Sequence, residues 1–227
     1  MKYIASVSWG KDSTAMIIKL ITNHMPLDEI VFYDTGMEFD AIYKTRDYMI
    51  EHWLKPYNIK YTELKPYKSF IYMMISHAHT TRNGKLRLGY GWCGGLCRWG
   101  TSQKTNALNK YCKDSIVYVG IAYDEPERYM RLTPNKHAPL YDMKITESDA
   151  LNICYESGID FGGLYKYLKR VSCWCCRNKN LTELTNYKKY LPKYFEKLCF
   201  LEEIIGEPMK PPYTLKERFG ELNEKEN

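Results

Sequence analysis

The residues best suited to phosphate chemistry follow the first apolar segment of the chain. Residues 3–7 are an apolar run typical of a buried strand, and Ser8-Trp9-Gly10-Lys11-Asp12-Ser13 leads from it into a segment with helical periodicity. Backbone N–H groups converge in such a turn, and the N-terminus of the following helix adds partial positive charge. Gly10 permits close approach of a phosphate, and Lys11 adds a cation. The turn is predicted to bind pyrophosphate; an ordinary capped strand-to-helix turn is the alternative.

A second segment places polar groups at the end of another strand. Residues 30–33 form an uninterrupted apolar run, as in a fully buried parallel strand, and Asp34-Thr35-Gly36 follows directly, ahead of a predicted helix over residues 40–53. Ligands of open α/β sheets bind at the carboxyl ends of the strands. Asp34 and Thr35 are therefore expected at the edge of the sheet where a ligand would bind.

Five of the eight cysteines fall into two short clusters. Cys93 and Cys97 flank a glycine-containing loop, and Cys173, Cys175 and Cys176 lie within a single turn. Four thiolates can hold Zn²⁺ or a [4Fe–4S] cluster, and we assign them to Cys93, Cys97, Cys173 and Cys176, with Cys175 as the spare. Buried or redox-active thiols without metal are the alternative. The three other cysteines lie in helical or apolar segments and are interpreted as core residues: Cys112, Cys154 and Cys199.

The elements that must position these residues alternate between strand and helix. Strands are expected at residues 3–7, 29–33, 60–64 and 116–121. Further helices are expected at residues 101–111, 150–156, 181–190 and 192–205, and a long Gly- and Arg-rich loop at residues 80–100. The pattern predicts an α/β fold with a doubly wound, mostly parallel sheet and a helical, Cys-rich C-terminal part. Residues 1–138 are expected to form the nucleotide-binding domain, and residues 139–227 a helical subdomain packed on it.

Composition limits the classes of protein that remain. The chain has 227 residues, a formal net charge of +6, and no apolar stretch near the length of about 20 residues that a membrane span needs. Eight cysteines without a signal peptide argue against a disulfide framework, so we expect a cytoplasmic protein with no membrane partner. Residues 221–227 are expected to be disordered.

Basic and aromatic residues leave a nucleic-acid partner open. Five cations cluster in or beside the long loop, and either clamp a phosphate or form a solvated surface: Arg82, Lys85, Arg87, Arg98 and Lys104. Tyrosines at 187, 190 and 194 alternate with lysines at 188, 189, 193 and 197. This mixture suits stacking and charge on RNA or DNA, but at helical spacing it is more often an amphipathic helix with extended lysines, which we favour.

Taken together, the motifs resemble a known family. Ser-x-Gly-x-Asp-Ser at residues 8–13 resembles the PP-loop of the adenine nucleotide α-hydrolase superfamily, and it lacks the spacing of a Walker A loop. Asp-Thr-Gly-x-x-Phe at residues 34–39 looks like the phosphoadenosine phosphosulfate reductase-like branch of that superfamily. The segments at residues 119–128 and 170–176 are similar to later motifs of the same branch, so the likeness covers residues 6 to about 190.

The resemblance implies an ATP-binding enzyme that cleaves ATP to AMP and pyrophosphate, with adenylylation and sulfur transfer as the expected chemistry. Its implied cofactors are ATP or a related adenine nucleotide, Mg²⁺ held by Asp12 or Asp34, and a [4Fe–4S] cluster, with Zn²⁺ as the alternative. The implied catalytic residues are Lys11, Asp12, Asp124, Glu125 and Arg128. The implied nucleotide-binding residues are Ser6, Ser8, Trp9, Gly10, Lys11, Asp12, Ser13, Asp34, Thr35, Gly36 and Gly120.

Two departures from the family pattern leave alternatives open. Ala122 stands where the family has arginine, and no cysteine follows Cys199, whereas sulfonucleotide reductases use a C-terminal cysteine as nucleophile. A reductase-like oxidoreductase is therefore the second hypothesis, and a non-catalytic nucleotide- or nucleic-acid-binding module is the third. A sulfur donor, a nucleic acid and a homodimer stay open as partners, and the acceptor substrate is not specified.

Overall fold

The computed structural model describes residues 1–220, which form two compact units. Unit 1 consists of residues 1–34, 38–65 and 104–164, and unit 2 of residues 35–37, 66–103 and 165 onward. The expected division of the chain after residue 138 stays a prediction. The expected disorder of residues 221–227 lies outside the described residues.

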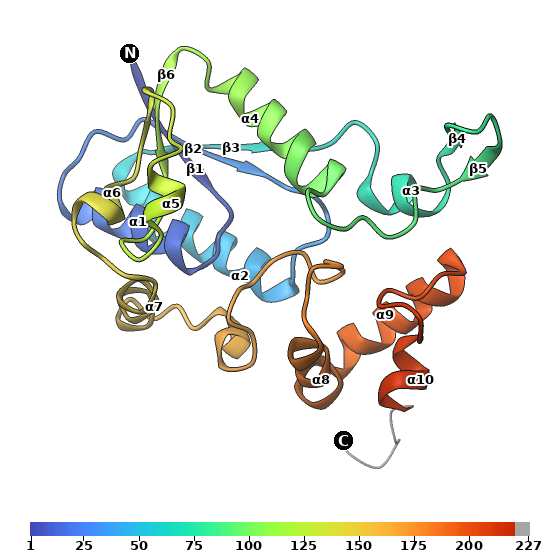
Figure 1. Cartoon of the computed structure of the whole chain (residues 1–227). Helices are drawn as coiled ribbons and strands as arrows, with labels where there is room; N and C mark the ends of the chain where they lie inside the picture. Colours follow the sequence, from blue (N-terminus) through green and yellow to red (C-terminus); the bar gives the residue numbers. More distant parts are fainter. Residues whose placement is uncertain (221–227) are drawn as a thin grey trace. The chain divides into compact units, whose positions relative to one another are not determined.

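Unit 1 is built on a parallel five-stranded sheet with strand order β3-β2-β1-β6-β7 (Figure 1). The strands are β1 (Lys2–Val7), β2 (Glu29–Tyr33), β3 (Lys60–Leu64), β6 (Ser115–Val119) and β7 (Lys136–His137). β1 lies at the centre, where Ser6 is opposite Val31 of β2 and Val119 of β6. The four predicted strands are confirmed to within two residues. The fifth strand is only two residues long, too short for a recognisable periodicity.

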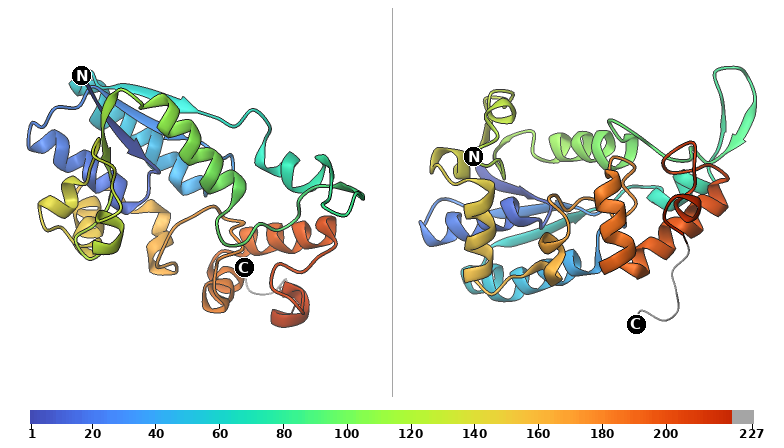
Figure 2. Two further views of the ribbon diagram at one scale, coloured as in Figure 1. Left: turned by 45° about the horizontal axis from the view of Figure 1, so that its top comes forward. Right: turned by 60° about the horizontal axis from the view of Figure 1, so that its bottom comes forward.

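Helices cover both faces of this sheet, as the doubly wound pattern requires (Figure 2). α1 (Lys11–Thr22) and α2 (Asp40–Met49) lie on one face, and α4 (Lys104–Tyr111) lies on the other. The chain continues from α2 through a π-helical turn at Ile50–Leu54 and a 3₁₀ turn at Lys55–Tyr57. The remaining helical segments of the unit are α5 (Pro126–Tyr129), α6 (Pro139–Asp142) and α7 (Glu147–Glu156). The α/β fold class is thus confirmed.

Burial explains why these strands form. All five residues of β2 are buried, and the apolar run at residues 30–33 is what a strand covered on both faces requires. Ile4 and Val31 are nearly inaccessible and pack with Val117 and Cys112. This cluster buries apolar surface of β1, β2 and β6, and so fixes the central strands whose carboxyl ends carry the candidate site.

Unit 2 is mainly helical. It contains α3 (Phe70–Ile75), a π-helical turn at Arg98–Gln103, α8 (Leu181–Tyr190), α9 (Pro192–Ile205) and α10 (Leu215–Phe219). A further 3₁₀ segment, Phe161–Lys166, runs from the end of unit 1 into unit 2. The predicted bounds of α8 and α9 agree with the structure, because Asn180 and Glu183 form a capping box and Pro192 starts α9.

The expectation of an irregular loop over residues 80–100 is wrong in part. β4 (Ala78–Thr80) and β5 (Leu86–Leu88) pair as an antiparallel hairpin. Gly84 adopts φ +76° in its turn, a conformation that glycine permits without strain. Asn83-Gly84 is a hairpin signal, but each strand is too short to be recognised by alternation. Within residues 1–220, no helix combines the length and apolarity needed to cross a membrane.

Candidate nucleotide site and cysteine cluster

The turn between β1 and α1 has an unusual backbone. Trp9 adopts φ +58° and is fully buried, with its ring against Phe32 and Tyr61. This side chain anchors the turn in the core of unit 1. Gly10 is the N-cap of α1, and no side chain caps the helix. α2 and α9 likewise lack a side-chain cap, whereas α7, α8 and α10 each begin with a capping box. The first amides of α1 therefore suit an anion.

The two serines of the turn bond to each other and to the backbone. The Ser13 hydroxyl donates to the Gly10 carbonyl at 3.1 Å and accepts from the Ser8 N–H at 3.2 Å. The two hydroxyl oxygens lie 3.4 Å apart. Both hydroxyls were expected to face a phosphate, and in this structure they also brace the turn from within. Ser6 is the penultimate residue of β1, where it pairs with Val31 of β2 and Val119 of β6.

Lys11 is nearly buried and lies between two carboxylates. Its Nζ is 2.9 Å from Asp12 Oδ1 and 2.9 Å from Glu147 Oε2, and only 7 % of the residue is exposed. Burial disfavours the charged amine, but hydrogen bonds and charges of Asp12 and Glu147 outweigh it and raise the pKa of Lys11. Burial raises the pKa of Asp12, and the nearby Glu147 and Glu125 add to this against the opposing effect of Lys11. The turn thus combines a cation with an excess of carboxylates.

Gly120, at the end of β6, is required by its neighbours. A Cβ at this position would lie 2.8 Å from Ser13 N and 2.9 Å from Ser13 Cα. Real contacts of a Cβ are not that short, and both atoms belong to the backbone of α1. Glycine at position 120 therefore lets β6 approach the first turn of α1, which holds the candidate phosphate-binding amides.

We expect Gly120→Ala to lower the free energy of unfolding by about 1–3 kcal/mol, because the backbone of α1 must shift to admit the methyl group. Gly94→Ala is the matched control, since its added Cβ meets only Arg177 Cδ at 3.6 Å. Urea unfolding of both variants measures the difference. Equal losses of stability in the two variants would show that a side chain at residue 120 does not prevent β6 from approaching the first turn of α1.

The residues predicted to be catalytic after β6 have partners within unit 1. Both carboxylate oxygens of Glu125 accept from Arg128, at 2.5 and 2.6 Å, and Glu125 Oε2 also accepts from the Ala122 N–H at 3.3 Å. Asp124 Oδ1 accepts from the Glu147 N–H at 2.9 Å. Asp124 therefore fixes the start of α7, and with it the carboxylate that contacts Lys11. Of the three, Glu125 is close enough to influence Asp12.

Asp34, at the end of β2, is held by a tyrosine. Asp34 Oδ1 accepts from the Tyr43 hydroxyl at 2.7 Å, and burial together with this carboxylate raises the pKa of Tyr43. Thr35 and Gly36 follow in the chain but belong to unit 2. There Thr35 Oγ1 accepts from the Met37 N–H at 3.2 Å, and it lies 3.6 Å from the Cys173 sulfur.

The structure brings the two cysteine loops of unit 2 together. Asn178 joins them, because its Nδ2 donates to the Gly95 carbonyl at 3.0 Å and its Oδ1 accepts from the Gly95 N–H at 3.1 Å. A Cβ on Gly100 would lie 3.6 Å from the Cys97 sulfur and 3.8 Å from the Cys173 sulfur. One sulfur from each loop thus adjoins the same small space, which glycine leaves open.

Backbone donors surround the sulfurs. The Arg98 N–H donates to Cys93 Sγ at 3.4 Å, and the Gly100 N–H donates to Cys97 Sγ at 3.3 Å. Such bonds stabilise thiolates and orient metal ligands. Lys179 is 2 % exposed and its ammonium donates to Ser172 Oγ at 3.3 Å; its positive charge also interacts with Cys173 and Cys176. Burial lowers the pKa of this lysine.

Exposure divides the cysteines into two groups. Those assigned as ligands are half-buried: Cys93, Cys97, Cys173 and Cys176. Those assigned to the core or as the spare are buried: Cys112, Cys154, Cys175 and Cys199. As the side chains stand, no three His, Cys, Asp or Glu residues within positions 1–220 form a group that could hold a metal ion. The donor set, its N–H···S bonds and the open space beside Gly100 nevertheless fit a cysteine-ligated centre.

Three residues of the nucleotide site and the cysteine cluster were not predicted from the sequence. Glu147 reads as a helix-start residue, because acids are common in first turns, and its contact with Lys11 arises only through the fold. Tyr43 lies on α2 and has no motif of its own. Asn178 follows the cysteine cluster, and its pairing with Gly95 across 83 positions of sequence has no local signal.

Comparison with known proteins gives a family match. The family model described as phosphoadenosine phosphosulfate reductase domain matches residues 2–136. An uncharacterized protein of Methanocaldococcus jannaschii is 26 % identical over 231 residues, an alignment that covers 96 % of this chain and 43 % of that protein. The chain therefore spans less than half the length of this relative.

A likeness also exists to a solved structure, the U34-tRNA thiolase NcsA from Methanococcus maripaludis with its [4Fe-4S] cluster. The two share 16 % sequence identity with a TM-score of 0.47, and the match covers 98 % of this chain and 82 % of the other.

Proposed function

Because the chain belongs to the phosphoadenosine phosphosulfate reductase domain family, we propose that it is an enzyme that binds ATP at the β1–α1 turn and cleaves it between the α- and β-phosphates. The start of α1 is the observation that carries this proposal. No side chain caps it, Lys11 at its first position is nearly buried, and Gly120 approaches it closely. This arrangement supplies several donors to one anion and leaves no room for a side chain at residue 120.

The turn would act by stabilising charge. Cleavage between the α- and β-phosphates leaves negative charge on pyrophosphate, and the amides at the start of α1 would donate hydrogen bonds to it. Lys11 would move its hydrogen bonds from Asp12 and Glu147 to a phosphate oxygen. A nucleophile of the acceptor would attack the α-phosphorus as pyrophosphate leaves, which gives an adenylylated acceptor. A second nucleophile would then form a bond to the acceptor and displace AMP; if water attacks the α-phosphorus instead, AMP forms directly.

Mg²⁺ is expected to enter with the nucleotide, because it prefers carboxylates together with substrate phosphates. Of the two candidate carboxylates, Asp12 is favoured over Asp34. Asp12 lies near the negative charges of Glu125 and Glu147, which a cation would offset, whereas Asp34 already accepts a hydrogen bond from Tyr43.

In unit 2 we propose that Cys93, Cys97, Cys173 and Cys176 ligate a [4Fe–4S] cluster, with Zn²⁺ as the alternative. When bound, such a cluster would supply a redox-active or sulfur-binding centre. Asn178 would keep the two loops together, and the Arg98 and Gly100 amides would stabilise the thiolates of Cys93 and Cys97. Buried Trp92 and Trp99 would limit access of water.

Product analysis tests the proposed reaction. With ATP and Mg²⁺, the protein should form AMP and pyrophosphate in equal amounts, as measured by ³¹P NMR and by chromatography of ATP labelled in the α-phosphate. Formation of ADP and phosphate would contradict cleavage at the α–β bond. Tight ATP binding without turnover, under conditions that include thiols and sulfide as acceptors, would favour the non-catalytic alternative.

The reductase-like alternative has a separate assay. Thioredoxin-dependent release of sulfite from adenylyl sulfate, or from its 3′-phosphorylated form, would establish it. At Ala122, where the family has arginine, the backbone N–H donates to Glu125 Oε2 and the side chain is fully buried. This position therefore provides no cation for an anionic sulfonucleotide.

A further inference from the structure

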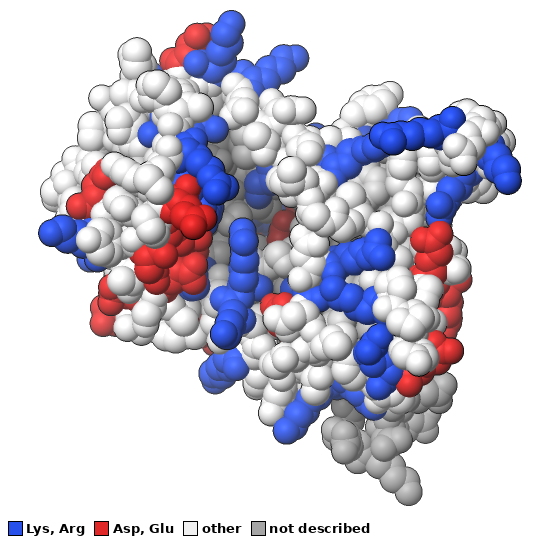
Figure 3. All heavy atoms as spheres, in the orientation of Figure 1, with Lys and Arg blue, Asp and Glu red and all other residues white. Residues whose placement is uncertain are grey.

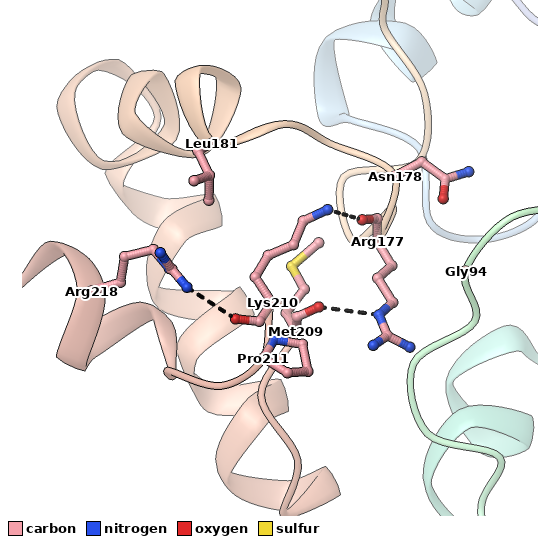
Figure 4. A pocket seen from close by; sticks show the side chains of 8 residues that line it. All are labelled: Gly94, Arg177, Asn178, Leu181, Met209, Lys210, Pro211 and Arg218. Atoms are coloured by element: carbon pink, nitrogen blue, oxygen red, sulfur yellow. Dashed lines mark hydrogen bonds between the residues drawn. The ribbon is translucent and has the colours of Figure 1, made fainter.

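Unit 2 contains a hollow that the proposed reaction does not use (Figure 4). Its volume is about 440 Å³. Arg177, Lys210 and Arg218 line it together with an apolar group consisting of Leu181, Met209 and Pro211. We call it the basic hollow. Such a volume exceeds that of a lone phosphate and falls in the range of small-molecule sites.

The three cations of the basic hollow are held by neutral groups. Arg177 Nε donates to the Met209 carbonyl at 3.1 Å, Lys210 Nζ to the Arg177 carbonyl at 2.5 Å, and Arg218 Nη2 to the Lys210 carbonyl at 3.4 Å (Figure 4). Among residues 1–220, none of the three forms an ion pair with a carboxylate.

The arrangement is electrostatically unfavourable without an anion. Arg218 Nε is buried and donates to no acceptor within the described part of the chain. Burial and the charge of Arg177 lower the pKa of Lys210, against the opposing charges of Cys176 and Glu183. A buried donor without an acceptor and like charges close together both cost free energy, and an anion in the hollow would relieve both costs. Guanidinium groups match phosphate oxygens in geometry.

The other residues in and beside the basic hollow indicate which kind of anion it would bind. Leu181 and Pro211 are exposed and offer apolar contact to the remainder of a phosphate ester. Tyr213 is 55 % exposed, and the Arg218 guanidinium lies 5.4 Å from the centre of its ring. An exposed aromatic ring next to a cation is a stacking surface for a nucleobase. The combination fits one nucleotide better than it fits inorganic phosphate.

The charge of unit 2 favours a strand over a free nucleotide. Its described residues include 17 Lys and Arg against 6 Asp and Glu, whereas unit 1 has 15 against 18. On the face drawn in Figure 3, Lys and Arg side chains are spread over the region of β4, β5 and α8 to α10. Such a surface attracts a polyanion through many phosphates at once.

We propose that the basic hollow binds a phosphate and its nucleotide within a single strand of nucleic acid. This inference does not depend on the proposed cleavage of ATP, because it concerns other residues and is tested without ATP.

Leu181 allows a test that leaves the cations in place. It lies at the first position of α8, is 47 % exposed, and lines the hollow. Leu181→Glu would add a carboxylate facing the cations, at a helix start where an acid is tolerated. Leu181→Gln is the matched control, equal in size and neutral. Binding of fluorescein-labelled single-stranded RNA and DNA oligonucleotides would be measured by fluorescence anisotropy over a series of salt concentrations.

We expect Leu181→Glu to weaken oligonucleotide binding about tenfold and to reduce its salt dependence by about one phosphate contact, while Leu181→Gln stays within about twofold of the parent. A second pair of variants removes charge instead. Lys210→Gln with Arg218→Gln should weaken binding more than Lys169→Gln with Arg170→Gln, which removes the same charge from exposed positions of the same unit.

Thermal unfolding of each variant checks that it is folded. Equal oligonucleotide binding by Leu181→Glu and Leu181→Gln would overturn the proposal. If the parent bound a fluorescent mononucleotide but none of the oligonucleotides, the strand would be excluded as the source of the phosphate.

Discussion

Serine at any one of Cys93, Cys97, Cys173 or Cys176 should remove most of the bound metal from the protein. A hydroxyl is a much poorer ligand than a thiolate, and changes even to groups behind a metal ligand typically cost 10–100-fold in affinity. We therefore expect anaerobically purified variants to lose the broad visible absorbance of a [4Fe–4S] cluster, together with more than about half of their iron and acid-labile sulfide.

The matched controls are Cys112→Ser and Cys199→Ser. Both residues are buried, and burial raises the pKa of each thiol to about 11. A serine there should reduce stability, because a hydroxyl replaces an apolar sulfur, but should leave metal per folded chain unchanged. If the four variants bound as much metal as the parent, the cysteine loops would not be its ligands. If the parent protein contained zinc and no iron, Zn²⁺ would be its metal in place of a [4Fe–4S] cluster.

Lys11→Met should remove about half or more of the stabilisation that ATP gives to the protein. Methionine keeps the length and packing of the buried stem and removes the cation. A hydrogen bond to a charged group contributes about 1.5–3 kcal/mol, so ATP should bind about 10–150-fold more weakly. At ATP concentrations of about 100 times the parent Kd, the parent should gain about 2.7 kcal/mol, or about 5–10 °C in Tm, and the variant about 0.3–1.4 kcal/mol.

Lys19→Met on the same helix is the control, because Lys19 lies in the last turn of α1. It should respond to ATP like the parent. Without ATP, Lys11→Met leaves Asp12 and Glu147 without their shared cation, so its own Tm has to be measured as the reference. An ATP response equal to that of Lys19→Met would mean that Lys11 does not contact the nucleotide.

Local sequence patterns predicted the elements that position the nucleotide site. The apolar run of β2, the turn residues after β1 and the capping residues of α8 each act within a few positions of the chain, and the corresponding elements appear where expected. The order of strands could not be derived in this way, because the pairing of β1 with both β2 and β6 depends on contacts distant in sequence.

The same distinction applies to the candidate site. Gly120 was assigned from a motif, but the structure gives the physical reason, a backbone contact with Ser13 more than a hundred positions earlier. The role of Glu147 as a partner of Lys11 and that of Asn178 as a link between cysteine loops depend wholly on the fold. The three cations of the basic hollow come from separate segments, and none belongs to a pattern that would group them.

Hydrogen–deuterium exchange in the presence of a non-hydrolysable ATP analogue tests the central claim most directly. No side chain caps the start of α1, so its first amides should exchange quickly in the protein without nucleotide. A bound triphosphate should slow exchange in peptides that cover residues 8–16 and leave the β4–β5 hairpin (residues 78–88) unchanged. If equilibrium dialysis shows the analogue bound and residues 8–16 exchange as in the free protein, the β1–α1 turn is not the nucleotide site.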